Sequence, residues 1–332
     1  MTASRFRATV ALLCCVTLLL FHFSLVIGPA GMTTGESLRA LLGGGEELQV
    51  LVMQEIRLPR ALLGLVVGAT LGLSGGALQG FLRNPLAEPG LIGISASASL
   101  GAVIAIYTGL SALFALALPL LALVGAMLAV IILRAMAGPD GRPLAVILTG
   151  VAISSFAAAM TSLVLNLSPN PFAATEIVFW MLGSLTDRSM THVWLILPFT
   201  LVGWFMLFRL GRALDALSLG PDAAASMGID MRHAQRLVIL GTALSVGAAT
   251  AVTGAIGFIG LVVPHVLRPF VGAQPSRLLP ASALGGASLL LAADILVRVV
   301  APERDLKLGV VTAIVGAPFF LWLVWSYRRT AL

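Results

Sequence analysis

The stretch RLPRALLGLVVGATLGLSGGALQGFLRNPLAEPG, from Arg57 to Gly90, decides the fold of this chain. An uncharged, apolar run separates Arg60 from Arg83, and a membrane helix needs about 20 such residues to cross the hydrocarbon core. Small residues recur along the run near helical spacing, which favours close helix packing in lipid. The prolines in Asn-Pro-Leu-Ala-Glu-Pro-Gly cannot continue a helix. The stretch therefore predicts a membrane-spanning helix that ends in a rigid reversal.

Composition extends this interpretation to the whole chain. Hydrophobic residues make up 59% and charged residues 10% of the sequence, whereas about a quarter of a soluble domain is charged. Backbone groups in lipid must be satisfied internally, so the apolar runs predict helices. The sequence thus predicts an all-α polytopic membrane protein with one transmembrane domain over residues 1–332. Its ten expected spans are approximately 8–28, 58–80, 91–108, 112–133, 144–166, 192–209, 234–253, 255–271, 279–300 and 309–327.

Charge predicts the orientation of these spans. With the N-terminus in the cytoplasm, cytoplasmic segments hold 13 of the 20 basic residues and five acidic ones, a net +8. The outer segments then carry a net −2. The positive-inside rule favours this topology, with both termini cytoplasmic. The basic composition therefore reports topology, and the sequence gives no reason to expect nucleic-acid binding.

The spans lack the groups that several other classes of protein need. Ion-coupled carriers usually keep an ionisable residue or an unwound helix near the bilayer centre. Here Asp294 and Arg298 lie one helical turn apart near an outer end, where they can pair with each other. No HExxH or GxxxxGKS motif occurs, so the metalloprotease and ATPase chemistry of these motifs is missing. The sequence therefore predicts that the chain is not an enzyme. Energy for its function would come from a partner or from the substrate's own gradient.

The longest cytoplasmic connection, residues 210–236, contains a helix signal. Gly220 and Pro221 break the chain, Asp222 can cap, and the residues that follow favour a short helix ending at Gly228. A short helix across the inner membrane face can enter the groove of a soluble partner. An ordinary interfacial helix explains the pattern equally well.

The chain resembles the permeases of ABC importers of the FecCD type, which serve iron-siderophores, haem and cobalamin. Asp222-Ala223-Ala224 followed by Gly228 looks like the Glu-Ala-Ala-x-x-x-Gly coupling element of such permeases, with Asp in place of Glu. The likeness runs from about residue 50 to the C-terminus. Four further blocks carry it: RLPR at 57–60, RNPLAEPG at 83–90, GAIGFIGLVVPH at 254–265, and GVVT with GAPF at 309–312 and 316–319.

The resemblance implies a ten-helix subunit in the inner membrane of a bacterium, paired around a central pathway. The second permease subunit would be another copy of this chain, or a relative in a heterodimer. Two cytoplasmic ATP-binding subunits would use ATP, and an extracytoplasmic binding protein would deliver substrate. The chain itself would bind no cofactor and no metal, and its other contacts would be with membrane lipid. Alternating access would then move the substrate between the two permease subunits.

The resemblance also implies roles for individual residues at the inner face. Asp222, Ala223, Ala224 and Gly228 would belong to the coupling helix that enters the ATPase cleft. Because the Asp side chain is shorter, it is in doubt whether it makes the contact that the family's Glu makes. The presence of the helix is less in doubt.

Asn84 and Leu86 match positions at which the family narrows the cytoplasmic end of the pathway. Asn84 can cap the reversal that the neighbouring prolines enforce. The other inner constriction of the family has small hydroxyl residues, where this chain has Pro143 and Leu144, so no gate role is carried over there.

On the outer face, Arg57, Arg60 and Arg298 match arginines that the family presents to carboxylates on the binding protein. Exposed opposite charges steer docking and fix its register. Interfacial anchoring, or pairing of Arg298 with Asp294, is the alternative role of these side chains.

Three interpretations of the whole chain stay open at this stage. The first is an importer permease for an iron chelate, siderophore or haem, and cobalamin is the alternative substrate of the same class. The second is an ion-coupled secondary carrier, which the missing intramembrane carboxylates and the coupling element oppose. The third is a membrane scaffold or sensor, which the outer arginines and the inner helix oppose.

Overall fold

The computed structural model describes residues 2–28, 31–114, 116–138, 143–168, 170–301 and 306–330, without the side chains of residues 327–330. Asp140 and Arg142, which enter the predicted cytoplasmic charge, lie outside the described residues. The side chains of Arg328 and Arg329 lie outside them as well.

The first half of the chain forms a long N-terminal helix, a small outer cap and the central helix of the bundle. Its elements are α1 (Ala3–Val26), α2 (Thr34–Leu41), α3 (Glu47–Leu51), a π-helical turn η1 (Val52–Arg57), α4 (Leu58–Leu82), a 3-10 turn η2 (Pro89–Ile92), α5 (Ile94–Tyr107), α6 (Leu110–Leu113), α7 (Ala117–Ala137) and α8 (Pro143–Asn166). The outer cap consists of α2 and α3, and the turn η1 continues from α3 into α4 without a loop.

The second half adds a short helix on the outer side, two on the inner side and five long or medium helices. They are α9 (Pro171–Met181), α10 (Met190–Phe208), α11 (Gly211–Ser218), α12 (Pro221–Ser226), α13 (Met231–Thr253), α14 (Ile259–Val271), α15 (Pro275–Val300) and α16 (Leu308–Thr330). An irregular stretch between α13 and α14, from Gly254 to Phe258, confirms the predicted division of the apolar region 234–271.

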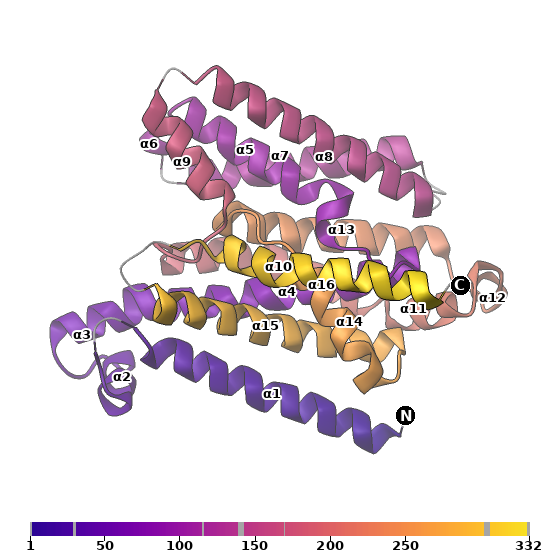
Figure 1. Cartoon of the computed structure of the whole chain (residues 1–332), viewed down its shortest axis with the longest axis horizontal. Coiled ribbons are helices and arrows are strands. Elements are labelled where there is room, and N and C mark those ends of the chain that lie inside the picture. Colours follow the sequence, from indigo (N-terminus) through magenta and orange to yellow (C-terminus); the bar gives the residue numbers. More distant parts are fainter. Residues whose placement is uncertain are drawn as a thin grey trace.

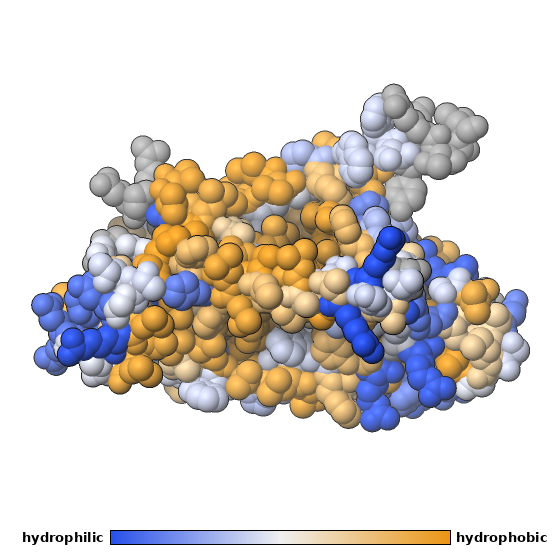
Figure 2. All heavy atoms as spheres, turned by 90° about the horizontal axis from the view of Figure 1, so that it is seen from below, coloured by the Kyte–Doolittle hydropathy of each residue, from blue (hydrophilic) through white to orange (hydrophobic). Residues whose placement is uncertain are grey.

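Ten helices of the described chain fit the predicted membrane crossings. Eight are long and apolar enough to span a bilayer, and α5 and α14 are shorter apolar helices. Figure 2 shows a broad apolar band across the molecule between two hydrophilic ends. Because lipid tails solvate apolar side chains, this band is what a membrane-embedded surface requires.

Helix α4 forms the core, with nearly all of its side chains buried. Glycines bring its backbone against those of two other helices: a Cβ on Gly68 or Gly72 would collide with the α15 backbone at Gly286 or Ser282. A Cβ on Gly75 would collide in the same way with the α14 backbone at Gly260. The small-residue face that the sequence predicts thus packs helices tightly, as expected where no hydrophobic force drives association.

The two ends of the bundle differ in structure. The start of α1 and the end of α16 lie at the same end of the molecule as α12 (Figure 1). The small helices α2 and α3 lie at the opposite end (Figure 1). An even number of crossings requires both termini on one side, so the α12 end is the predicted cytoplasmic end and the α2–α3 end is the outer one.

Candidate functional site: an inner coupling helix and an outer arginine cluster

Helix α12 presents most of its surface to the cytoplasm. Asp222 is exposed, Ala223 is half-buried and Ala224 is fully buried, so the helix rests on one alanine and exposes its other side. Met227, directly after the helix, is 61% exposed. The predicted cap is wrong in one detail: Gly220 occupies the N-cap position, and the Asp222 side chain lies in the first turn without a capping hydrogen bond.

Gly228 ends this segment in a left-handed backbone conformation with φ +76°. Its N–H donates to the Ala225 carbonyl at 3.0 Å, and the next N–H, of Ile229, donates to the Ala224 carbonyl at 3.0 Å. Glycine reaches such a φ without the steric cost that a Cβ imposes. Gly228 therefore fixes the direction in which the chain leaves α12.

Helix α11 connects α12 to the bundle through Asp215. Its Oδ1 accepts a hydrogen bond from the Ser276 N–H at 2.8 Å, and its Oδ2 accepts one from Gln274 Nε2 at 3.0 Å. These two groups belong to the start of α15, and a Cβ on Gly80 of α4 would meet the Leu214 side chain of α11. Displacement of α12 can thus be transmitted through α11 to α4 and α15.

The inner end of α4 turns sharply at the predicted gate. Arg83 takes a left-handed φ of 49°, and the Asn84 Oδ1 accepts a hydrogen bond from the Leu86 N–H at 3.0 Å. This side-chain contact confirms the predicted cap of the reversal. Asn84 and Leu86 are both half-buried, so they lie at the surface of the inner end.

Glu88 follows in the same reversal and contacts the irregular stretch before α14. Burial raises the pKa of its carboxyl, and a hydrogen bond from the Phe258 N–H acts in the opposite direction. Phe258 itself has a positive φ of 68°. Nearby, Gln79 donates to the Gly260 carbonyl at 3.3 Å and accepts a hydrogen bond from Arg268 at 2.8 Å. The inner end of α4 is therefore joined to α14 by polar contacts.

The three predicted docking arginines come together at the outer end. Arg60 Nη2 lies 2.8 Å from the Asp294 Oδ1, and Arg298 Nη2 lies 2.9 Å from the Asp294 Oδ2. The predicted pair of Asp294 with Arg298 is thus confirmed, and Arg60 joins it. Arg57 Nη1 donates to the carbonyls of Leu25 and Val26 at the end of α1.

Burial distinguishes these side chains from the exposed charges that the docking hypothesis assumed. Arg57 is 4% exposed, and the side chains of Arg60 and Arg298 are 15% and 8% exposed. Charges this far from solvent need internal partners, which Asp294 and the carbonyls of α1 supply. Their role in docking stays a prediction.

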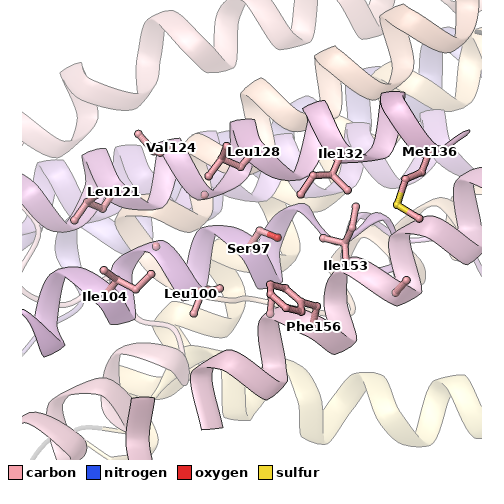
Figure 3. A pocket seen from close by; sticks show the side chains of 14 residues that line it. Ser97, Leu100, Ile104, Leu121, Val124, Leu128, Ile132, Met136, Ile153 and Phe156 are labelled. Atoms are coloured by element: carbon pink, nitrogen blue, oxygen red, sulfur yellow. The ribbon is translucent and has the colours of Figure 1, made fainter. Parts of the chain in front are cut away.

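An apolar groove of 410 Å³ lies between α5, α7 and α8. Figure 3 shows Leu128, Ile132, Ile153 and Phe156 around it, with the Ser97 hydroxyl as a polar group on its wall. Such a surface suits contact with lipid or with another apolar helix, and it offers no group for acid–base or metal chemistry. Within the described residues, no cluster of three or more His, Cys, Asp or Glu side chains could hold a metal ion.

The fold and these sites define a polytopic helical membrane protein with an exposed helix at its inner face. The FecCD transport family model matches residues 16–326. The chain belongs to this family.

The comparisons with individual proteins agree. The chain is 39% identical over 277 residues to the Fe(3+) dicitrate transport system permease protein FecD of Escherichia coli, covering 83% of this chain and 86% of that one. It is 38% identical over 295 residues to the cobalamin import system permease protein BtuC of Halobacterium salinarum, covering 87% and 77%. A solved inward-facing conformation of a metal-chelate type ABC transporter superimposes with a TM-score of 0.85 at 30% identity, covering 96% of this chain and 98% of that one.

Family membership establishes the class of protein and its location. The chain is a permease of the ABC transporter type and a multi-pass protein of the bacterial inner membrane. Permeases of this family are not enzymes themselves, and ATP hydrolysis belongs to partner subunits. The family also implies a second permease subunit.

Several residues of these sites have no local signal in the sequence. Their contacts link positions 59 to 234 residues apart, so no local motif could show them. These contacts are those of Asp215 with Gln274, of Gln79 with Arg268 and of Arg60 with Asp294. One available signal was Asp294 itself, a carboxylate near the outer end of a span, where a charge needs partners.

Proposed function

We propose that this chain is the permease subunit of an importer that receives an iron chelate, a siderophore or haem complex, from an extracytoplasmic binding protein. Two permease subunits would enclose the pathway and carry two ATP-binding subunits. In the assembly that we favour, both permease subunits are copies of this chain. A heterodimer with a related permease is the alternative assembly. The exposed helix α12 at the inner end is the observation that carries the importer proposal.

Helix α12 suits insertion into a cleft of the ATP-binding subunit. Asp222 and the turn around Gly228 are exposed, while Ala224 anchors the helix to the membrane domain. Small residues such as Ala223 let a partner approach the helix backbone closely. A movement of the ATPase would then act on α4 and α15 through α11, because Asp215 joins α11 to the start of α15.

At the outer end, the cluster that Arg57, Arg60 and Arg298 form would dock carboxylates of the binding protein. The cluster holds three guanidinium groups and one internal carboxylate, which only Arg60 and Arg298 contact, so excess positive charge remains. Such charge steers an acidic partner and fixes its register. At the inner end, Asn84 and Leu86 would narrow the pathway, since both lie at the turn where α4 ends.

Transport would proceed by alternating access. A loaded binding protein docks outside, ATP closes the two ATP-binding subunits, and the coupling helices move with them. The bundle then rocks and opens the pathway at the opposite face. Bare apolar spans provide no strong site for a chelate, so substrate passes without being trapped.

The substrate is tested with the complete complex, reconstituted with its ATP-binding subunit and the binding protein that the same membranes supply. Radiolabelled ferric siderophore, haemin and cobalamin are offered separately. Uptake of an iron chelate, dependent on ATP and on the binding protein, is expected. Uptake of cobalamin alone would reassign the substrate, and this second candidate rests on the 38% identity to the cobalamin permease. Saturable uptake driven by an ion gradient without ATP would contradict the importer proposal and support a secondary carrier.

A further inference from the structure

Asp294 is the centre of a polar network at the outer end of the bundle. Its side chain is 2% exposed, and it accepts contacts from arginines of two helices. Arg60 of α4 approaches through Nε, 2.9 Å from Oδ1 and 3.2 Å from Oδ2, and through Nη2 at 2.8 Å from Oδ1. Arg298 of α15 adds Nη2 at 2.9 Å from Oδ2. Both carboxylate oxygens are therefore occupied.

Arg298 has a second set of partners at the end of α1. Its Nη1 donates to the carbonyls of Ser24 and Ile27, each at 2.8 Å, and its Nη2 donates to the Ser24 hydroxyl at 2.7 Å. The last carbonyls of a helix have no partner within the helix, so these contacts satisfy them and favour a cation. Arg298 is thus fixed to α1 whatever Asp294 does.

Arg57 is fixed to α1 in the same way. Its Nη1 donates to the carbonyls of Leu25 at 3.0 Å and Val26 at 2.8 Å, and the residue is 4% exposed. Turning its guanidinium outward would break both hydrogen bonds and leave two helix-end carbonyls without a partner, which is costly.

Arg60 differs from both because Asp294 is its one polar partner in the described part of the chain. It is also the most exposed of the three, at 15% for its side chain. Nothing in α1 holds it. Among the outer arginines, Arg60 can therefore rotate toward an external carboxylate at the cost of a single ion pair.

We propose that Asp294 is an internal competitor that holds Arg60 in the undocked transporter, so that a carboxylate of the docking protein must displace it. This inference rests on the proposed docking function. When only a fraction of a site is free to bind, its apparent affinity falls by that fraction. Asp294 thereby keeps the resting affinity for the binding protein low, and Arg57 and Arg298 anchor α1 beside the released side chain.

The first experiment asks whether Asp294 holds Arg60, and it needs no docking partner. The probe is p-hydroxyphenylglyoxal, which modifies accessible guanidinium groups, added to the assembled complex in nanodiscs and read by peptide mass spectrometry. Asp294→Asn should raise the rate of Arg60 modification about tenfold, while Asp294→Glu should restore the wild-type rate. Glu46→Gln removes an exposed outer carboxylate and should change nothing. An unchanged rate at Arg60 in Asp294→Asn would overturn the proposal.

The second experiment measures docking of the binding protein recovered with the wild-type complex, on variants that retain their ATP-binding subunit. Asp294→Asn should tighten binding about tenfold at low salt, and Arg60→Gln should weaken it. Unchanged or weaker binding in Asp294→Asn would overturn competition and leave Asp294 a structural residue. Unchanged binding in Arg60→Gln would instead contradict the docking role of Arg60, and the modification rates would still decide whether Asp294 holds that side chain.

Discussion

The outer arginine cluster and the inner coupling helix differ in how far their side chains are buried and in what holds them in place. At the outer end, Arg57, Arg60 and Arg298 are largely buried, and Asp294 and the end of α1 satisfy most of their charge. At the inner end, α12 is held by the buried Ala224 and leaves its other side exposed. Ion pairs and hydrogen bonds within the chain fix the side chains of the outer site, whereas the backbone conformation around α12 fixes the inner site.

This difference indicates where each site is vulnerable. A buried charge is expensive to leave unpaired, so the outer cluster should depend on its partners. A short exposed helix makes few contacts, so the inner site should depend on the conformation of the residues that end it. Substitutions can test each dependence separately.

The largest effect should come from the helix core that supports both regions. Gly72→Val places a side chain against the backbone of Ser282, where even a Cβ would collide. We expect a loss of more than about 3 kcal/mol, so that little folded protein accumulates in the membrane. Fluorescence-detected size exclusion measures the folded fraction. Gly257→Ala, whose Cβ would meet nothing within 4 Å, is the matched control and should behave as wild type.

The next effect should separate the inner site from the outer one. Gly228→Val puts a β-branched residue at φ +76°, which L-residues avoid, and co-purification of the ATP-binding subunit should fall about tenfold. Gly228→Asn is the matched control, because asparagine tolerates this conformation, and it should retain the subunit. An equal loss of the ATP-binding subunit in both variants would show that binding is sensitive to any side chain at position 228, and not to the backbone conformation there.

A loss of stability should report on the outer cluster. Arg298→Gln removes one of the two arginines that Asp294 contacts and releases the carbonyls of Ser24 and Ile27. Breaking this buried pair should lower the free energy of unfolding by about 3 kcal/mol, measured by thermal denaturation in detergent. The surviving folded protein should still bind its ATP-binding subunit. Arg39→Gln, at an exposed outer position, should leave the stability unchanged.

The smallest effect should be a pH dependence at the inner reversal. Burial raises the pKa of Glu88 above its ordinary value of 4.5, so the folded state favours the protonated carboxyl. That stability is present below pH 4.5 and is lost as the pH rises through the folded pKa. At pH 8, Glu88→Gln should melt about 2 °C higher than wild type, and the difference should shrink toward pH 5. A difference that stays constant with pH would assign the effect to packing.

Much of the fold could be predicted from the sequence, because membrane helices depend on length and composition. The ten predicted spans each correspond to a helix, with ends that differ by at most five residues, as at 112–133 against α7. The short helices α2, α9 and α11 were not predicted, since eight to eleven residues with mixed composition carry little periodic signal.

The sites were predictable in part for the same reason. Local signals identified α12, the turn at Asn84 and the pair of Asp294 with Arg298. The burial of Arg57 and the tie between Arg60 and Asp294 arise from the approach of α1, α4 and α15, which only the tertiary structure shows.

The importer proposal depends most on contact between α12 and an ATP-binding subunit at the inner face of the membrane. A photo-cross-linking residue in place of Met227, which is 61% exposed beside α12, tests it in intact cells. The matched control carries the same residue in place of Leu48, 70% exposed at the outer end. We expect that position 227, and not 48, yields a covalent product with an ATP-binding protein, identified by mass spectrometry. No such product at 227, from protein that is folded and in the membrane, would contradict it.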